Sequence, residues 1–221
     1  MSAAFDQLGI EKMTVASGAL REGVLYELLG RMHHHDTREA TVQRFKRRYH
    51  ADAQQARRVQ MLALKLLGQI SHKLEMDGGV AEQYLTWAAR LHEIGISIAH
   101  SGYHKHSAYI LENADMPGFS RMEQQVLGLL VRCHRRGMTK VSLPPLSDDR
   151  TALIMVLRLA VLMHRNRQDA VLPEMKLSWS RQNGFRLVME PGWLAGNALG
   201  DAALMAEVAY WRDVGIPCTL E

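Results

Sequence analysis

The chain has 221 residues, of which 47% are hydrophobic, and it carries a formal net charge of +4. This length suits one large domain, or one domain with a small appendage, and the composition is ordinary for a globular protein. No segment approaches the roughly 18 apolar residues that a membrane-spanning helix needs. The two cysteines, Cys133 and Cys218, make no disulfide framework, and the N-terminus lacks a secretory signal pattern. We therefore expect a cytoplasmic protein.

The first 36 residues differ in pattern from the rest. Residues 12–16 predict a short strand, and residues 17–29 predict an amphipathic helix. A single strand needs a sheet to join, so we interpret residues 1–36 as the remnant of a preceding α/β domain and a linker. The tract His33-His34-His35 is expected to be an exposed part of that linker.

The pattern is helical from residue 37 to about residue 167, because apolar residues recur at spacings of three and four. Breaks fall at the turn-forming strings Asp77-Gly78-Gly79, Pro117-Gly118 and Leu143-Pro144-Pro145. We expect helices at residues 37–48, 52–75, 81–98, 102–114, 120–136 and 147–167. Residues 37–170 would then form one helical domain.

After Pro173, apolar and polar residues alternate instead of following the helical spacing. Residues 176–180 and 185–189 predict two strands, joined across a turn in which Asn183-Gly184 is a good hairpin signal. A helix is expected over residues 197–214, and the last residues could return as a third strand. Residues 171–221 are therefore expected to form a small α+β appendage.

Basic side chains are unevenly distributed along the chain. Such clusters raise the local potential for phosphates or nucleic acid, although each could also be a solvated helix face. The first cluster holds Arg38, Arg44, Lys46, Arg47, Arg48, Arg57 and Arg58, and the second holds Arg132, Arg135, Arg136 and Lys140.

The most specific short string is Leu91-His92-Glu93-Ile94-Gly95, at the end of an apolar helix. An adjacent imidazole and carboxylate can both reach one divalent cation if neighbouring helices add a further His and Asp. Structural histidines are common, so the pair by itself leaves metal ligation open.

Longer strings point to a known family. They are Ser17–Tyr26, Tyr49–Asp52 with Gln55–Val59, His100–Leu111, and Leu130–Arg136. The string Leu91–Gly95 stands where HD-domain phosphohydrolases carry His-Asp. Over residues 9–221 the sequence resembles the C-terminal region of the exopolyphosphatase and guanosine pentaphosphate phosphatase family.

The resemblance implies a mainly α fold, an HD-domain-like helical bundle with a small α+β C-terminal appendage and an N-terminal strand–helix remnant. In the family, acidic residues and a divalent metal in an N-terminal catalytic half activate water against a terminal phosphoanhydride. The resemblance thus implies Mg²⁺ or Mn²⁺ for the parent enzyme, and no cofactor for this fragment, which would be a shortened chain. The implied partners are inorganic polyphosphate or guanosine pentaphosphate, the chain's own N-terminal catalytic domains and a second copy in a homodimer. Neither a membrane nor nucleic acid is expected.

Against a working HD site the sequence departs at three positions. Gln55 stands for the first His, Glu93 for the Asp and Val161 for the last Asp, while His92 is retained. Catalytic metal sites usually need about three protein ligands and an open position. We therefore expect a vestigial site that holds no metal and performs no hydrolysis.

Several histidines and a lysine surround the start of the helix at 102–114, which Ser101 is expected to cap. Three interpretations stay open: a relocated metal site of His104, His106 and His134, an anion site at free helix amides, or hydrogen-bonded structural histidines. A phosphate chain is best held by a groove lined with Arg and Lys. The candidate polyanion-binding residues are Arg44, Arg47, Arg48, Arg57, Arg58, His100, His104, Lys105, His106, Arg132, His134, Arg135 and Arg136.

The leading hypothesis is the polyphosphate-binding and dimerisation portion of an exopolyphosphatase, inactive alone. The first alternative is a metal-dependent HD-type nucleotide phosphohydrolase, which would bind metal and lose activity on His92→Ala. The second is a structural or nucleic-acid-binding helical module, against which stands the small number of aromatic residues, four Phe and four Trp. The groups that would decide between polyphosphate and guanosine pentaphosphate are expected in the catalytic half.

Overall fold

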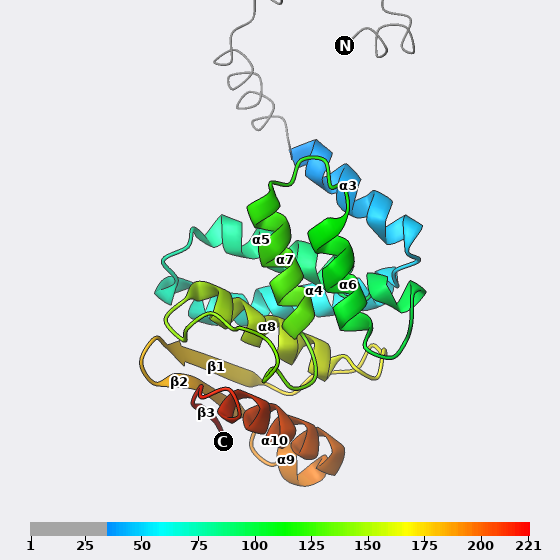
Figure 1. Cartoon of the computed structure of the whole chain (residues 1–221). Helices are drawn as coiled ribbons and strands as arrows, with labels where there is room; N and C mark the ends of the chain where they lie inside the picture. Colours follow the sequence, from blue (N-terminus) through cyan, green and yellow to red (C-terminus); the bar gives the residue numbers. More distant parts are fainter. Residues whose placement is uncertain (1–34) are drawn as a thin grey trace, which may run out of the picture.

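The computed structural model describes residues 35–221. The predicted strand at 12–16 and helix at 17–29, as well as His33 and His34, lie outside these residues. The bundle consists of α3 (His35–Arg48), α4 (Ala53–Ile70), α5 (Gly78–Leu91), α6 (Tyr103–Asn113), α7 (Arg121–Cys133) and α8 (Asp149–Met163). The C-terminal part consists of β1 (Met175–Ser180), β2 (Gly184–Met189), α9 (Trp193–Gly196), α10 (Ala198–Arg212) and β3 (Cys218–Leu220). The mainly helical fold with a small C-terminal sheet is thus confirmed (Figure 1).

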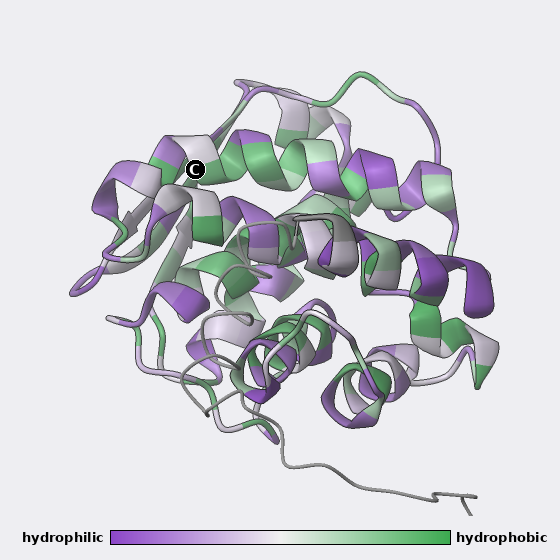
Figure 2. Ribbon diagram, turned by 90° about the horizontal axis from the view of Figure 1, so that it is seen from above, coloured by the Kyte–Doolittle hydropathy of each residue, from purple (hydrophilic) through white to green (hydrophobic). Residues whose placement is uncertain are grey.

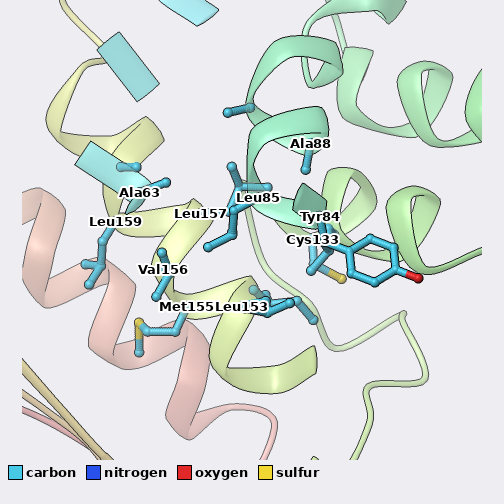
Figure 3. Packing of buried hydrophobic residues seen from close by; sticks show 14 of the residues in the cluster. Ala63, Tyr84, Leu85, Ala88, Cys133, Leu153, Met155, Val156, Leu157 and Leu159 are labelled. Carbon is cyan, nitrogen blue, oxygen red and sulfur yellow. The ribbon is translucent and has the colours of Figure 1, made fainter. Parts of the chain in front are cut away.

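Helix α8 forms the centre of the bundle, and α4, α5 and α7 all pack against it. Every residue from Thr151 to Ala160 is buried. A helix that is apolar on all sides has to be enclosed by other elements, and this stretch is apolar except at Thr151 and Arg158. Figure 3 shows the α8 side chains lying among those of α4 and α5, including Ala63 and Leu85.

The surrounding helices are amphipathic. Their ribbons carry both hydrophilic and hydrophobic stretches (Figure 2), as expected of helices that bury one side only. Helix α4 buries Val59, Ala63, Leu66 and Ile70, which recur at spacings of three and four. None of the described helices is both long and apolar enough to cross a membrane.

Several predicted helix boundaries differ from those of the structure. The helix predicted at 52–75 ends at Ile70 and continues as a 3₁₀ turn, Ser71–Lys73. The helix predicted at 81–98 begins at Gly78, because the Asp77 side chain accepts a hydrogen bond from the Val80 amide. It ends at Leu91 and is followed by a second 3₁₀ turn, Ile94–Ser97, which we call the 94–97 turn.

The expected cap of α6 at Ser101 was also wrong. The N-cap is Gly102, in the left-handed region with φ of 69°, and it makes no side-chain capping hydrogen bond. Glycine adopts this conformation without the steric cost that Cβ imposes on other residues.

The C-terminal sheet has the strand order β1-β2-β3. The predicted hairpin is present, with Met175 opposite Met189 and Ser180 opposite Gly184. The third strand suggested for the last residues is also present, and it runs parallel to β2. Helix α10 matches the predicted helix at 197–214 within a few residues.

The sheet lies between the helical bundle and α10 (Figure 1). Strand β1 packs against α4, and the Gln69 side chain joins the two. Its Nε2 donates to the Met175 carbonyl at 3.0 Å, and its Oε1 accepts from the Leu177 amide at 2.6 Å. The C-terminal part is therefore hydrogen-bonded to the bundle as well as packed on it.

Candidate functional site

A pocket of about 440 Å³ opens between α4, α8, α10 and the ends of α5 and α7. Gln55, Glu93 and Val161, three positions of the predicted vestigial HD site, all line it. His92 is adjacent, because its Nε2 lies 3.9 Å from Oε1 of Glu93 and its ring centroid lies 5.1 Å from that of His134. The fold thus brings together positions of the HD pattern that lie more than 100 residues apart in the sequence, such as Gln55 and Val161.

His92 and His134 have the same hydrogen-bonding arrangement. Their Nδ1 atoms lie 2.7 and 2.6 Å from the carbonyl oxygens of Ala89 and Val131, so each Nδ1 carries the proton and donates it. The Nε2 of His92 has no hydrogen-bond partner among residues 35–221, and that of His134 lies 3.5 Å from the Tyr103 hydroxyl. Burial lowers the pKa of both imidazoles, so both are neutral near pH 7.

A guanidinium faces Glu93, which stands where the HD pattern has its aspartate. Arg167 forms ion pairs with Glu93 and with Asp52, the latter at 2.9 Å. Val161 offers no donor atom, and across residues 35–221 no three His, Cys, Asp or Glu side chains gather so that they could hold a metal ion. The described residues of this site therefore do not fit a divalent metal.

His104, His106 and His134, the residues of the alternative relocated metal site, do not come together as a set of ligands within residues 35–221. His104 is buried with its ring centroid 6.2 Å from that of His134, and the three side chains do not form a ligand group. Burial, together with the nearby Arg135 and other cations, lowers the pKa of His104 to about 4. Its Nδ1 has no hydrogen-bond partner within the described part of the chain.

Positive charge dominates the pocket, which is lined by arginines and by Glu93 and Glu207. Both carboxylates are paired, Glu93 with Arg167 and Glu207 with Arg158 at 2.5 Å. The remaining lining arginines form no ion pair with a carboxylate of residues 35–221, and they are Arg135, Arg136 and Arg165. The pocket therefore presents an excess of positive charge, which favours an anionic ligand.

The predicted polyanion-binding residues fall into separate sets. Four of them line the pocket, namely His100, His134, Arg135 and Arg136. The arginines of α3 and the first one of α4 are exposed on the surface, namely Arg44, Arg47, Arg48 and Arg57. Arg58 is ion-paired with Asp169 at 2.5 Å. Lys105 is exposed, whereas Arg132 and His106 are half-buried.

Several pocket residues were missed from the sequence, namely Tyr103, Arg158, Arg165, Arg167 and Glu207. Arg158 carried a signal, because a charged residue in the middle of an apolar helix is rarely buried without a partner. The pair Arg165 and Arg167 also carried one, since both directly follow the helix that holds Val161. Glu207 reaches the pocket from α10, and no local pattern relates it to the bundle.

The sequence matches a known protein family and several of its members. Residues 37–208 match the family described as Ppx/GppA phosphatase, domain III. Over 216 residues the chain is 39% identical to a guanosine-5'-triphosphate,3'-diphosphate pyrophosphatase of Pseudoalteromonas translucida, covering 96% of this chain and 43% of the relative. Proteins of the same name from Vibrio vulnificus and Vibrio cholerae are 35% and 36% identical, and each alignment covers 99% of this chain and 44% of the relative.

The chain therefore spans less than half the length of these relatives. The match confirms the family to which the sequence strings pointed, and it covers most of the helical bundle and the C-terminal part up to α10. The chain belongs to the Ppx/GppA phosphatase family, and its residues 37–208 correspond to domain III of that family.

Proposed function

We propose that this chain is the C-terminal portion of an enzyme that hydrolyses terminal phosphoanhydrides of polyphosphate or guanosine pentaphosphate. In this proposal the chain binds the phosphate chain and performs no hydrolysis by itself. The observation that supports it most is that Arg167 pairs with Glu93 and that Val161, which lines the same pocket, offers no ligand atom. The names of the relatives, which describe pyrophosphatases of guanosine-5'-triphosphate,3'-diphosphate, support the reaction class of the parent.

Binding follows from the chemistry of the pocket. A guanidinium is always charged near neutral pH and offers its N–H donors in a planar fork, which matches phosphate oxygens. Arg135, Arg136 and Arg165 have no carboxylate partner within the described residues, so no acidic side chain there neutralises the charge that they offer to phosphates. The exposed arginines of α3 would contact further phosphates of a long chain.

Hydrolysis is assigned to the N-terminal catalytic domains of the parent, where Mg²⁺ or Mn²⁺ is expected. The chain would contact those domains and a second copy of itself, as the family resemblance implies. Sedimentation analysis of the purified chain tests the dimer, and a monomer at high protein concentration would contradict it.

The first experiment is binding of fluorescent long-chain polyphosphate at low and high salt, with orthophosphate release followed after addition of Mg²⁺ or Mn²⁺. We expect affinity to fall steeply with salt and no orthophosphate to appear. Arg135→Gln should weaken binding and lower the salt slope by about one unit. Arg212→Gln is the matched control, because it removes the same charge from an exposed position of α10 that does not line the pocket.

Two results would contradict the proposal. Orthophosphate release that is abolished by His92→Ala would favour the HD-type nucleotide phosphohydrolase. Equal competition by a nucleic acid duplex of matched charge would favour a nucleic-acid-binding module.

A further inference from the structure

We propose that Arg167 is a gate between two pockets, which Asp52 and Glu93 hold closed and which an anionic ligand opens by taking the guanidinium from these carboxylates. The inference rests on the proposed function, because it describes how binding of a phosphate chain to the same pocket is regulated. The contact is autoinhibitory, since carboxylates of the protein itself occupy a cation that the ligand would otherwise bind.

A second, smaller pocket lies beside the one described above. Its volume is about 240 Å³, and residues 49–52 and the 94–97 turn contribute to its lining. Three residues line both pockets, namely Glu93, Ile96 and Arg167. These three residues therefore lie between the two cavities, and a movement of one of their side chains away from the others would join the cavities.

Arg167 is the movable member of this group. Its side chain is 42% exposed, whereas that of Glu93 is only 9% exposed. It lies in the connection between α8 and β1, where every residue from 165 to 171 is exposed. Residues 168–173 form no backbone–backbone hydrogen bond with any residue from 35 to 221. Exposed segments with so few hydrogen bonds open at a low cost in free energy, so the side chain of Arg167 can leave its partners without disturbing the bundle.

The two carboxylates that hold Arg167 are fixed in place. Asp52 is the N-cap of α4, and its Oδ1 accepts hydrogen bonds from the Gln54 and Gln55 amides at 2.9 and 3.0 Å. Its Oδ2 lies 2.9 Å from Nη1 of Arg167, and Glu93 pairs with Nη2. The amide hydrogen bonds and the nearby guanidinium lower the pKa of Asp52, so this carboxylate is ionised near neutral pH.

The closed gate disfavours an anion in the larger pocket. One guanidinium and two carboxylates leave an excess of one negative charge at the gate. A ligand that turns Arg167 towards itself gains a further guanidinium, but it has to bind that group more strongly than the carboxylates do. The exchange therefore favours a ligand with several negative charges, because its other phosphates are attracted to Arg135, Arg136 and Arg165.

The backbone of the larger pocket is strained at two lining residues. Arg136 and Arg167 adopt φ values of 66° and 55°, the left-handed region that non-glycine residues seldom occupy. Such conformations persist only where the surroundings hold them. The buried Arg158 supports the first, because its Nη2 donates to the Arg136 carbonyl at 3.0 Å. Arg167 has its two ion pairs and a turn hydrogen bond from its amide to the His164 carbonyl at 3.0 Å, so loss of the ion pairs would also let the strain relax.

The test titrates inorganic tripolyphosphate calorimetrically into the purified chain and its variants. Asp52→Asn removes one charge that competes for Arg167 and keeps the helix cap, because asparagine caps helices as well as aspartate does. We expect this variant to bind tripolyphosphate about two- to fivefold more tightly, as the loss of one exposed ion pair would give. Asp77→Asn is the matched control, since Asp77 is the exposed N-cap of α5, and that helix of 14 residues places it about 20 Å from the pocket at the other end.

Two further measurements test the gate itself. In an Arg167→Gln background, Asp52→Asn should strengthen binding no more than Asp77→Asn does, because the gain acts through the guanidinium. Hydrogen exchange of the Arg167 amide reports opening without a ligand, since this amide is bonded to the His164 carbonyl. Exchange at this amide should be about two- to fivefold faster in Asp52→Asn than in Asp77→Asn.

The outcomes separate this inference from the proposed function. Tighter binding and faster exchange in Asp52→Asn than in Asp77→Asn support the inference. Equal effects of the two variants on affinity or on exchange, or a gain that persists without Arg167, overturn it; the proposed function then stands if binding of long-chain polyphosphate remains salt-sensitive. Absence of binding of both tripolyphosphate and long-chain polyphosphate by every variant overturns both.

Discussion

Arg158 lies in the middle of α8 with only 1% of its surface exposed, and its partners are buried as well. Its guanidinium donates to Glu207 at 2.5 Å and to the carbonyls of Cys133 and Arg136. Glu207 in turn accepts a hydrogen bond from Trp211 Nε1 at 2.8 Å. This network joins α8 to α10 and to the strained turn after α7, so one residue connects the core with the wall of the pocket.

Arg158→Met is expected to lower the free energy of unfolding by about 3–5 kcal/mol, because Glu207 would remain buried without its cation. Urea unfolding measures this change. Arg186→Met is the control, since Arg186 pairs with Glu221 at the surface, where water screens the two charges and the pair adds little to stability. Similar losses for the two variants would contradict the importance of the buried network.

The buried histidines make stability depend on pH in a defined window. The folded protein holds the pKa of His104 at about 4, and burial also lowers the pKa values of His92 and His134. In the unfolded chain a histidine has a pKa of about 6.5. The unfolded state therefore binds the additional protons as the pH falls below about 6.5, and stability is full above that value and lost below it.

The free energy of unfolding should thus fall between pH 7 and pH 5, by at most about 1.4 kcal/mol per pH unit for each such histidine. Chemical unfolding at several pH values measures the slope. His104→Gln should make the free energy of unfolding fall less steeply with pH, because the contribution of His104 is removed. A stability that stays constant from pH 7 to pH 5 would show that these imidazoles protonate in the folded protein without cost.

At the scale of elements, Gly95 decides how the 94–97 turn meets α6. A Cβ atom at this position would collide with the Tyr103 carbonyl and the Ser107 amide. The Gly95 amide also donates to Ser107 Oγ at 2.8 Å, and that hydroxyl donates to the His92 carbonyl at 2.9 Å. The close approach of the turn and α6 holds the segment with His92 in place beside the pocket.

Gly95→Ala is expected to destabilise the protein by about 1–3 kcal/mol, because backbone atoms have to move apart. Gly68→Ala is a control with the opposite sign. A Cβ built at Gly68, which is exposed in α4, would meet no described atom within 4 Å apart from its chain neighbours and its own helix backbone, and alanine favours helix there by up to about 1 kcal/mol. Thermal unfolding distinguishes the two, and a neutral Gly95→Ala would contradict the close packing.

At the scale of the whole molecule, the bundle and the C-terminal sheet share one core. Trp179 of β1 is 1% exposed, and its carbonyl accepts a hydrogen bond from Lys73 Nζ at 2.9 Å. Gln69 adds the two hydrogen bonds from α4 to β1. Because the contacts between the two parts are buried and polar groups are paired across them, neither part is expected to unfold without the other.

The variant Trp87→Phe tests this cooperativity, because it removes the tryptophan of the bundle and leaves those of the C-terminal part. We expect fluorescence and far-UV circular dichroism to report one coincident urea transition. An earlier fluorescence transition would show that the C-terminal part unfolds separately. Both signals come from the same variant, so any change in its overall stability does not affect the comparison.

Within residues 35–221, patterns in the amino-acid sequence were enough to predict most helices and strands and the buried sides of helices such as α4. Val59, Ala63, Leu66 and Ile70 of α4 follow the helical period, and Asn183-Gly184 marks the hairpin. These patterns can be recognised in the sequence because helix burial requires apolar residues at regular spacings, and a tight hairpin turn requires residues that tolerate its backbone conformation. Alignment with the HD pattern also identified Gln55, Glu93 and Val161 as one group, and they do line one pocket.

Which charged groups meet in that pocket could not be predicted, because it depends on contacts between elements that are distant in sequence. Arg167, which follows α8 and has a left-handed backbone conformation, pairs with Glu93. Glu207 pairs with Arg158 from α10, which begins 40 residues after Arg158. The helix ends at Ile70 and Leu91 were likewise mispredicted. Interactions between residues distant in sequence leave no periodic trace, so the pairing of charges in the pocket follows from how the elements pack together.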